Sequence, residues 1–404
     1  MSKPLQGVKV VEIAQEVAGP FAGLLLSDLG AEVVKIENRT GGDTSRGLVD
    51  IAIGGAEAKN PMLAPMFIGM NRGKRSVSCD LKKPEGAGIV RRMVGSYDVL
   101  LTNYRPGVLE RLGLGFDELC KINPRIIYAQ GSSWGPAGPW TTRPARDPLA
   151  QAAGGLMAKT GMPGDPPLVA GSFVADNSGA LALAAGIMAG LFARERTGEA
   201  QRVDSSIYGT MIAMQATEIN YTSFSGLESG PAGRGAHPFL FGVWGAFPTR
   251  DGHICLGGVD DKRWTAFCRV MGIEHLEKDP DCAAHMRNIR GHKIHAELDK
   301  IFPTRTTREW LAALTEIDVL VTEVASYKSI LASEQARANG YLLEMEHPTA
   351  GNVTVAGSPL TFNSEIQHRS AAPPDLGQHT EEVLLELGYT WEQITRLREA
   401  QVIL

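Results

Sequence analysis

The sequence has little cysteine and no excess of positive charge. Five cysteines occur in 404 residues, none of them in a CxxC pair, and lysine plus arginine number 40 against 45 acidic residues. An odd number of scattered thiols indicates reduced cysteines, so we expect a cytoplasmic protein without a metal site. A net charge of −5 with mixed signs gives no reason to expect nucleic acid or an anionic membrane surface as a partner.

Long hydrophobic runs and common ligand-binding motifs are also missing. The start, "MSKPLQGVKVVEIAQ", has no apolar signal region, and the longest apolar run, residues 179–193, is short and rich in glycine. We therefore expect no membrane-spanning segment. No GxGxxG, P-loop or GxSxG motif is present, and Pro20 removes a backbone donor from the first turn, "AQEVAGPFAG". These absences argue against a classical NAD site and against a serine hydrolase.

What is present is an alternation of strands and helices. Apolar runs such as "VKVVEI", "EVVKIEN", "DVLLTNY" and "RIIYAQG" are separated by helical patterns over the first 130 residues. This rhythm predicts an α/β fold with a doubly wound parallel sheet, Rossmann-like but without the glycine motif. Residues 38–70 show no period and predict a long loop. Residues 226–330, with a hairpin around the turn 249–252, predict a smaller α+β domain after a large domain of residues 1–225.

Basic residues follow several predicted strands, among them Arg39, Lys82, Arg105 and Arg111. Any one of them alone is best explained as solvated surface. However, "TNYRPG" places an amide, an aromatic ring and a guanidinium directly after a strand, where such sheets bind ligands. This combination suits a ligand with a base and phosphates, such as the nucleotide half of coenzyme A.

Asp176 is the first ionisable residue of the apolar segment "LVAGSFVADNSGALALAAGIMAGLFARERTG". By pattern alone it is best explained as the N-cap of a helix over 177–196 that ends at Gly198. Yet Gly179, Gly186 and Gly190 lie inside this helix, at a cost of roughly 1 kcal/mol each relative to alanine. They indicate a close approach of another group to the helix backbone.

A family resemblance rests on many ordered blocks. "VVEIAQEVAGPFAGLLLSDLGAEVVKIE", "GKRSVSCDLKKPEG", "YDVLLTNYRPGVLERLGL", "RDPLAQAAGGLM" and "GSFVADNSGALALAAGIMAGL" resemble the class III coenzyme A-transferases, which include formyl-, carnitine- and aryl-CoA transferases. The resemblance covers essentially the whole chain. It implies an enzyme that moves coenzyme A from an acyl-CoA donor to a small carboxylic acid, with acyl-CoA as substrate and no permanently bound cofactor.

The resemblance also implies roles for particular residues. Asp176 matches the family's nucleophile, which forms an aspartyl anhydride and then an enzyme–CoA thioester. A helix N-terminus at this residue is expected to keep its carboxylate ionised. Further matched positions are expected to contact coenzyme A or border the active site: Val17, Ala18, Arg39, Lys82, Asn103, Tyr104, Arg111, Arg146 and Asp147. Of these, Arg39 is displaced by one place from the family's usual basic position.

Two departures from the family bear on substrate and reaction. The formyl enzyme has a run of glycines in its small domain, whereas this chain has only Gly257 and Gly258 in "CLGGVDD". The racemase branch has His-Asp where this chain has Arg146-Asp147, and arginine does not exchange a proton as histidine does. The alternatives to a transferase are an acyl-CoA epimerase or intramolecular CoA transferase of the same fold, and a nonenzymatic CoA- or nucleotide-binding protein in which Asp176 is only a cap.

The resemblance finally implies an interlocked homodimer. The segments 224–238 and roughly 320–345 are placed to connect the two domains, and residues 331–404 are then expected to return to the large domain. No residue of the sequence identifies the donor or the acceptor acid.

Overall fold

A computed structural model describes residues 3–48, 64–228, 230–231, 233–234, 243–282, 294–369 and 371–404. The chain forms two compact units. The first comprises Met1–Gly154, Gly171–Ala216 and Ser333–Leu404, and the second comprises Gly155–Ala170 and Thr217–Ala332. Each unit is described by itself below.

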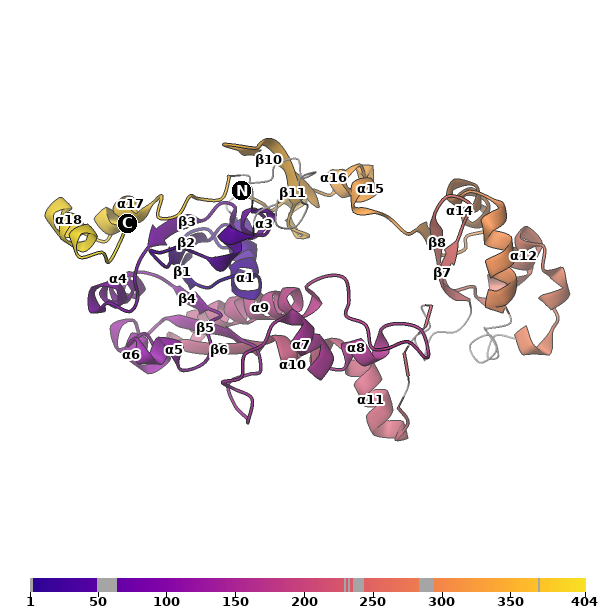
Figure 1. The fold of residues 1–404 in the computed structure, drawn as a ribbon, viewed down its shortest axis with the longest axis horizontal. Coiled ribbons are helices and arrows are strands. Elements are labelled where there is room, and N and C mark those ends of the chain that lie inside the picture. The colour runs from indigo at the N-terminus through magenta and orange to yellow at the C-terminus, as the bar shows by residue number, and fades with distance from the viewer. Residues whose placement is uncertain are drawn as a thin grey trace. The chain divides into compact units, whose positions relative to one another are not determined.

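The first unit is built on a six-stranded sheet (Figure 1). Its strands are β1 (Lys9–Ile13), β2 (Glu32–Glu37), β3 (Arg75–Ser78), β4 (Val99–Thr102), β5 (Ile127–Ser132) and β6 (Gln201–Ser206). Their order is β3-β2-β1-β4-β5-β6, and every neighbouring pair is parallel. The predicted doubly wound parallel sheet is thus confirmed, with its change of direction between β1 and β4.

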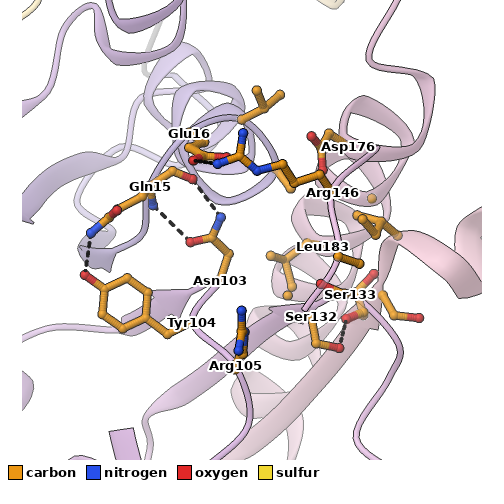
Figure 2. Close-up of a pocket in the computed structure, with 18 of the residues that line it drawn as sticks. Gln15, Glu16, Asn103, Tyr104, Arg105, Ser132, Ser133, Arg146, Asp176 and Leu183 are labelled. Carbon is orange, nitrogen blue, oxygen red and sulfur yellow. Dashed lines mark hydrogen bonds and ion pairs between the residues drawn. The ribbon is translucent and has the colours of Figure 1, made fainter. Parts of the chain in front are cut away.

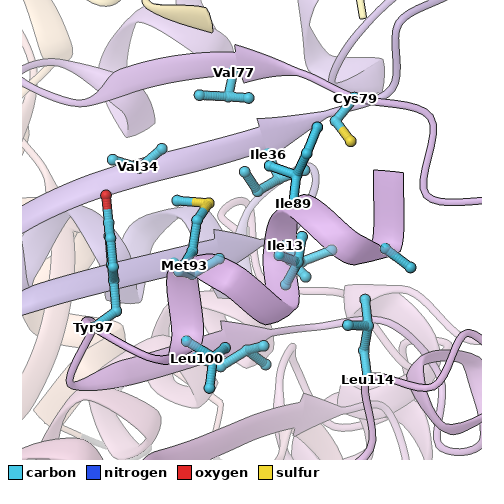
Figure 3. Packing of buried hydrophobic residues seen from close by; sticks show 14 of the residues in the cluster. Ile13, Val34, Ile36, Val77, Cys79, Ile89, Met93, Tyr97, Leu100 and Leu114 are labelled. Atoms are coloured by element: carbon cyan, nitrogen blue, oxygen red, sulfur yellow. The ribbon is translucent and has the colours of Figure 1, made fainter. Parts of the chain in front are cut away.

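Helices cover both faces of this sheet. On one face α4 (Pro84–Val94), α6 (Phe116–Ile122), α17 (Thr380–Glu386) and α18 (Trp391–Glu399) contribute to a core that includes Ile13, Val34 and Leu100 (Figure 3). On the other face α1 (Ala18–Asp28) and α9 (Val174–Thr197) pack over Val10, Val33 and Ile127. Strands buried on both sides explain why "VKVVEI" and "EVVKIEN" read as continuous apolar runs.

Close packing around helix α9 explains why it contains glycines. A Cβ atom added to Gly186 would lie 2.6 Å from Val203 Cγ1, and one added to Gly179 would lie 2.8 Å from Ile207 Cγ2. Gly190 is similarly close to Ile127, at 3.2 Å. The glycines therefore let α9 approach β5, β6 and the start of the following helix, as the sequence indicated.

The apolar run 179–193 lies within the longer helix α9. The helix has 24 residues, and among the described segments it alone is long and apolar enough to cross a bilayer by length and composition. It forms the crossover between β5 and β6, and its buried residues, such as Leu183 and Ile187, belong to the core of the sheet. The expectation of no membrane-spanning segment stays a prediction.

Further elements complete the first unit. The predicted loop 38–70 contains a short 3₁₀ helix, η1 (Thr44–Gly47), and the start of α3 (Pro65–Asn71), while residues 49–63 lie outside the described part. Short helices α5 (Val108–Arg111), α7 (Asp147–Ala153) and α10 (Ile207–Met214) follow β4, β5 and β6. The C-terminal residues add α16 (Glu334–Ala338) and two hairpins, β10 (Leu342–His347) with β11 (Gly351–Ala356) and β12 (Thr361–Phe362) with β13 (Glu365–Ile366).

The second unit has a small antiparallel sheet of β7 (Trp244–Pro248), β8 (His253–Gly257) and β9 (Val321–Glu323). The predicted hairpin is confirmed, and its turn closes with a 2.9 Å bond from the Thr249 N–H to the Gly252 carbonyl. Helices α12 (Asp261–Met271) and α14 (Thr307–Glu316) bury Phe267 and Trp310 in its core. The unit also contains α8 (Leu156–Lys159), α11 (Ala216–Ser225) and α15 (Tyr327–Leu331). Part of the expected connecting segment 224–238 lies outside the described residues.

Candidate active site

A cavity of about 530 Å³ opens at the carboxyl ends of β1, β4, β5 and β6, within the first unit (Figure 2). This is the point where the strand order reverses, which is where doubly wound sheets bind ligands. Six of the residues implied by the family resemblance line the cavity: Val17, Ala18, Asn103, Tyr104, Arg146 and Asp176. They are far apart in the sequence and meet only because the parallel strands end at one edge.

The Asn103 side chain fastens the turn after β4 to the turn after β1. Its Oδ1 accepts a bond from the Gln15 N–H at 2.9 Å, and its Nδ2 donates to the Gln15 carbonyl at 2.8 Å. The Gln15 side chain in turn donates from Nε2 to the Tyr104 hydroxyl at 2.9 Å. Asn103 thus shapes the wall of the cavity with both ends of its amide.

Glu16 is held in an unusual backbone conformation in that same turn. Its φ is +63°, a value that residues other than glycine rarely adopt. The Glu16 N–H donates to Asp43 Oδ1 at 3.0 Å, and the Ala14 carbonyl accepts a bond from Lys35 Nζ at 2.8 Å. Lys35 is fully buried and is also 2.9 Å from both Asp43 and Glu12. Buried ion pairs therefore fix the turn that carries Glu16 into the cavity.

Asp176 does not cap α9, so the N-cap interpretation of the sequence is wrong. The helix begins at Val174 with Phe173 as its N-cap residue, which places Asp176 in the first turn. The backbone N–H of Asp176 is one of the free donors at the start of the helix, and it donates to Asp147 Oδ2 at 3.0 Å. Asp147, not Asp176, therefore supplies the accepting carboxylate. Among the described residues, no hydrogen bond occupies the Asp176 carboxylate, which faces the cavity.

The expectation that the helix N-terminus keeps this carboxylate readily ionised is also corrected. Burial, followed by the nearby charges of Asp147 and Glu16, raises the pKa of Asp176 to about 7. Arg146 acts in the opposite direction. A carboxylate with a raised pKa is more basic than an ordinary aspartate, and, once ionised in a partly buried place, it is poorly solvated. Both properties favour a nucleophile.

Arg146 and Asp147 are neighbours in sequence with different surroundings. Arg146 precedes α7 and its Nη2 lies 3.4 Å from Glu16 Oε1, with 78% of its side chain exposed. Asp147 is buried, does not line the cavity, and accepts bonds from the Asp176 N–H and from Gln151 Nε2. It therefore supports Asp176 from behind, while Arg146 is directed into the cavity (Figure 2).

A second cavity of about 290 Å³ adjoins the first. Tyr104 and Val108 line both cavities, and Lys82 and Arg111 line only the second. The two predicted cations thus line one cavity, which does not include Asp176. Asn38 lines this second cavity. Its neighbour Arg39 is half-buried and lines neither of the two cavities. The role of Arg39 stays a prediction.

Sequence reasoning missed several residues of the first cavity. Gln15 and Glu16 follow β1, and two serine pairs, Ser132-Ser133 and Ser205-Ser206, lie at the ends of β5 and β6. The rule that ligands lie beyond the carboxyl ends of parallel strands marks all of these positions. The proximity of Glu16 to Asp176, however, depends on the crossover that brings α9 back to the sheet.

Known proteins resemble this chain along its full length. A profile described as CoA-transferase family III matches residues 5–380. An acyl-CoA transferase of Fusarium pseudograminearum is 34% identical, covering 99% of this chain and 88% of the relative. A mouse succinyl-CoA:glutarate CoA-transferase is 31% identical (95% and 86% covered), and an Escherichia coli formyl-CoA:oxalate CoA-transferase is 29% identical (100% of both).

Solved structures agree with these relatives. The crystal structure of a CAIB/BAIF family protein from Brucella suis has a TM-score of 0.84 and 29% identity, covering 96% of this chain and all of that one. The similarity therefore extends over residues of both compact units. The chain belongs to CoA-transferase family III and is a CoA-transferase.

Proposed function

We propose that this enzyme transfers coenzyme A from an acyl-CoA to a small carboxylic acid through covalent intermediates on Asp176. The observation that carries the proposal is the Asp176 carboxylate, which accepts no hydrogen bond from the described residues and faces a cavity that shares Tyr104 and Val108 with a second cavity lined by Lys82 and Arg111. A thioester beside Asp176 would leave the phosphates of coenzyme A near two cations, which are suited to bind them. The relatives named above act on acyl-CoAs and short acids, by their names.

The steps exchange acyl groups without a net proton change. An Asp176 oxygen attacks the thioester carbonyl, the C–S bond breaks, and coenzyme A leaves as the thiolate beside a mixed anhydride. The thiolate then attacks the aspartyl carbonyl, which gives an enzyme–CoA thioester and releases the first acid as a carboxylate. An acceptor carboxylate attacks the carbonyl of that thioester, the C–S bond breaks, and a second mixed anhydride forms as the coenzyme A thiolate leaves. The thiolate then attacks the acceptor carbonyl of this anhydride, which gives the new acyl-CoA and frees the Asp176 carboxylate.

The residues around Asp176 assist these steps. Asp147 holds the Asp176 N–H and so fixes the first turn of α9. Burial and the charges of Asp147 and Glu16 keep the carboxylate basic. Among the serines at the ends of β5 and β6, Ser133, Ser205 and Ser206 have hydroxyl groups that can donate to an oxyanion in this cavity, whereas the Ser132 hydroxyl donates to the Ser205 carbonyl at 3.2 Å. Arg146 occupies the place of the racemase histidine and stays protonated, so it cannot accept a substrate proton and the epimerase alternative has no base at this position.

The test is intact-mass analysis after incubation with succinyl-CoA or acetyl-CoA. We expect a coenzyme A adduct on the wild type that hydroxylamine removes, and no adduct on Asp176→Asn, which preserves the shape of the side chain. An exposed control, Asp117→Asn on α6, should form the adduct as the wild type does. Incorporation of solvent deuterium at the acyl α-carbon without an adduct would instead establish the epimerase reaction.

A homodimer is part of the proposal, because the family resemblance implies it. Residues 333–404 belong to the same compact unit as the sheet although residues 217–332 form another, so the chain passes between the units more than once. This connectivity is compatible with two interlocked chains.

A further inference from the structure

Arg146 is a cation whose position is tied to Asp176. It is the N-cap residue of α7, and the next residue, Asp147, binds the Asp176 N–H at 3.0 Å. Its charge acts on Asp176 directly and lowers the pKa of that carboxyl against the effect of burial. The other arginine of this cavity, Arg105, follows Tyr104 after β4 and lines the first cavity but not the second (Figure 2).

Most of the hydrogen-bonding capacity of Arg146 is unused. A guanidinium has five N–H donors in a planar fork that matches a carboxylate. Within the described residues, Arg146 makes one contact with an acid, 3.4 Å from Nη2 to Glu16 Oε1, and its side chain is 78% exposed. An arginine with free donors in a cavity is suited to bind a carboxylate of a ligand.

Glu16 is the more rigid member of this ion pair. Its backbone is fixed by Asp43 at a φ of +63°, and its Oε1 also accepts a bond from Thr44 Oγ1 at 3.3 Å. Glu16 and Asp176 both line this side of the cavity, and the buried Asp147 lies behind Asp176, so the electrostatic environment there is acidic. A second negative group of a substrate is therefore repelled unless it faces Arg146.

We propose that Arg146 binds a second carboxylate of the acid substrate, so that the enzyme prefers dicarboxylic acids, and that Glu16 is the anion from which Arg146 separates when the acid binds. This inference rests on the proposed function of Asp176. The substrate class it names is an aliphatic dicarboxylate whose reacting end reaches Asp176 while its other end meets the guanidinium.

The experiment is a competition between two acids of equal chain length, glutarate and pentanoate, at equal concentration with one acyl-CoA donor. The ratio of glutaryl-CoA to pentanoyl-CoA, measured by mass spectrometry, gives the ratio of the two kcat/KM values. Changes in the donor step, in folding or in the protonation of Asp176 affect both acids alike and cancel. We expect wild type to favour glutarate.

Three variants test the assignment. Arg146→Gln should lower the ratio at least about tenfold, because a charge-assisted bidentate pair is lost. Glu16→Gln should raise the ratio by up to about fivefold, since it removes the competing anion of an exposed ion pair. Arg143→Gln, in the same loop but stacked on Trp140 and outside the cavity lining, should leave it unchanged.

The outcomes separate the two proposals. A glutarate preference that survives Arg146→Gln, or that is absent in the wild type while adduct and transfer are observed, overturns the role of Arg146 and leaves Asp176 in place. Failure of the wild type to form an adduct with either succinyl-CoA or acetyl-CoA counts against the proposed function itself. A ratio that falls equally in Arg143→Gln shows a general charge effect and also refutes the assignment.

Discussion

The backbone N–H of Asp176 donates a 3.0 Å hydrogen bond to the carboxylate of Asp147. One acid thus holds the helical turn that presents the other, and its negative charge lies close enough to raise the pKa of its neighbour. The same contact therefore determines both the position and the basicity of the proposed nucleophile.

This contact predicts the pH dependence of the reaction. Because Asp176 must be ionised to attack and its pKa is about 7, kcat/KM for acyl-CoA should rise with pH through about 7. Asp147→Asn removes a negative charge, so the midpoint should move to lower pH by about one unit. Asp117→Asn is the control, and pH–rate profiles of the three proteins are the measurement. An unchanged midpoint in Asp147→Asn would show that the titration belongs to another group.

The raised pKa also predicts a cost in stability. The folded-state pKa of Asp176, about 7, lies above its ordinary value of 3.8, so the folded protein binds this proton more tightly than the unfolded chain. Stability from this group is present below the unfolded pKa and is lost as pH rises through about 7. Asp176→Asn, neutral at every pH, should therefore increase the free energy of unfolding on the order of 2–4 kcal/mol at pH 8.

Urea denaturation of wild type and Asp176→Asn at pH 8 and pH 5 measures this difference. The stabilisation should be clearly smaller at pH 5, where the folded wild type is protonated at Asp176. A variant that is less stable than the wild type at pH 8 contradicts the raised pKa.

The second cavity predicts where coenzyme A is held. Lys82→Ala and Arg111→Ala should each raise KM for acyl-CoA about tenfold with little change in kcat, because phosphate contacts are the same in the ground and transition states. Lys121→Ala, an exposed lysine on α6, serves as the control. Steady-state kinetics with varied acyl-CoA give the answer, and unchanged KM in both cavity variants would remove the second cavity from the binding site.

The glycines of α9 predict an unusual response to alanine. Gly186→Ala places a Cβ 2.6 Å from Val203 Cγ1, so it should destabilise by about 1–3 kcal/mol despite the better helix propensity of alanine. Gly88→Ala in α4 is the matched comparison, since its Cβ meets nothing closer than Arg91 Nη2 at 4.0 Å. There we expect stabilisation of up to about 1 kcal/mol. Thermal unfolding of both variants is sufficient, and equal responses would contradict the close packing of α9.

The proposed interlocked dimer predicts a molecular mass. Light scattering should give twice 43.3 kDa at every accessible dilution, with dissociation only on unfolding. A folded monomer at micromolar concentration would show that the two chains do not interlock.

The sequence determined the sheet and one edge of its site. Continuous apolar strands, such as those that contain Val11 and Val34, are typical of a parallel sheet whose two faces are both covered by helices. Parallel strands also bring their carboxyl ends together at one edge of the sheet. The positions of Asn103 and Tyr104 after β4 therefore followed from local pattern, and so did the hairpin turn at 249–252. The family resemblance supplied Asp176, which the pattern alone assigned to a cap.

Only the tertiary structure decided the surroundings of that aspartate. The helix α9 starts at Val174, and its first turn is held by Asp147, which accepts the N–H of Asp176 from a position twenty-nine residues earlier in the chain. The pKa of Asp176 depends on burial and on two acids outside α9, Asp147 at the start of α7 and Glu16 in the turn after β1. Glu16 reaches it because buried Lys35 and Asp43 fix that turn. Sequence patterns report the spacing of neighbours along one element, whereas desolvation and Coulomb interactions depend on distances between elements, which folding alone establishes.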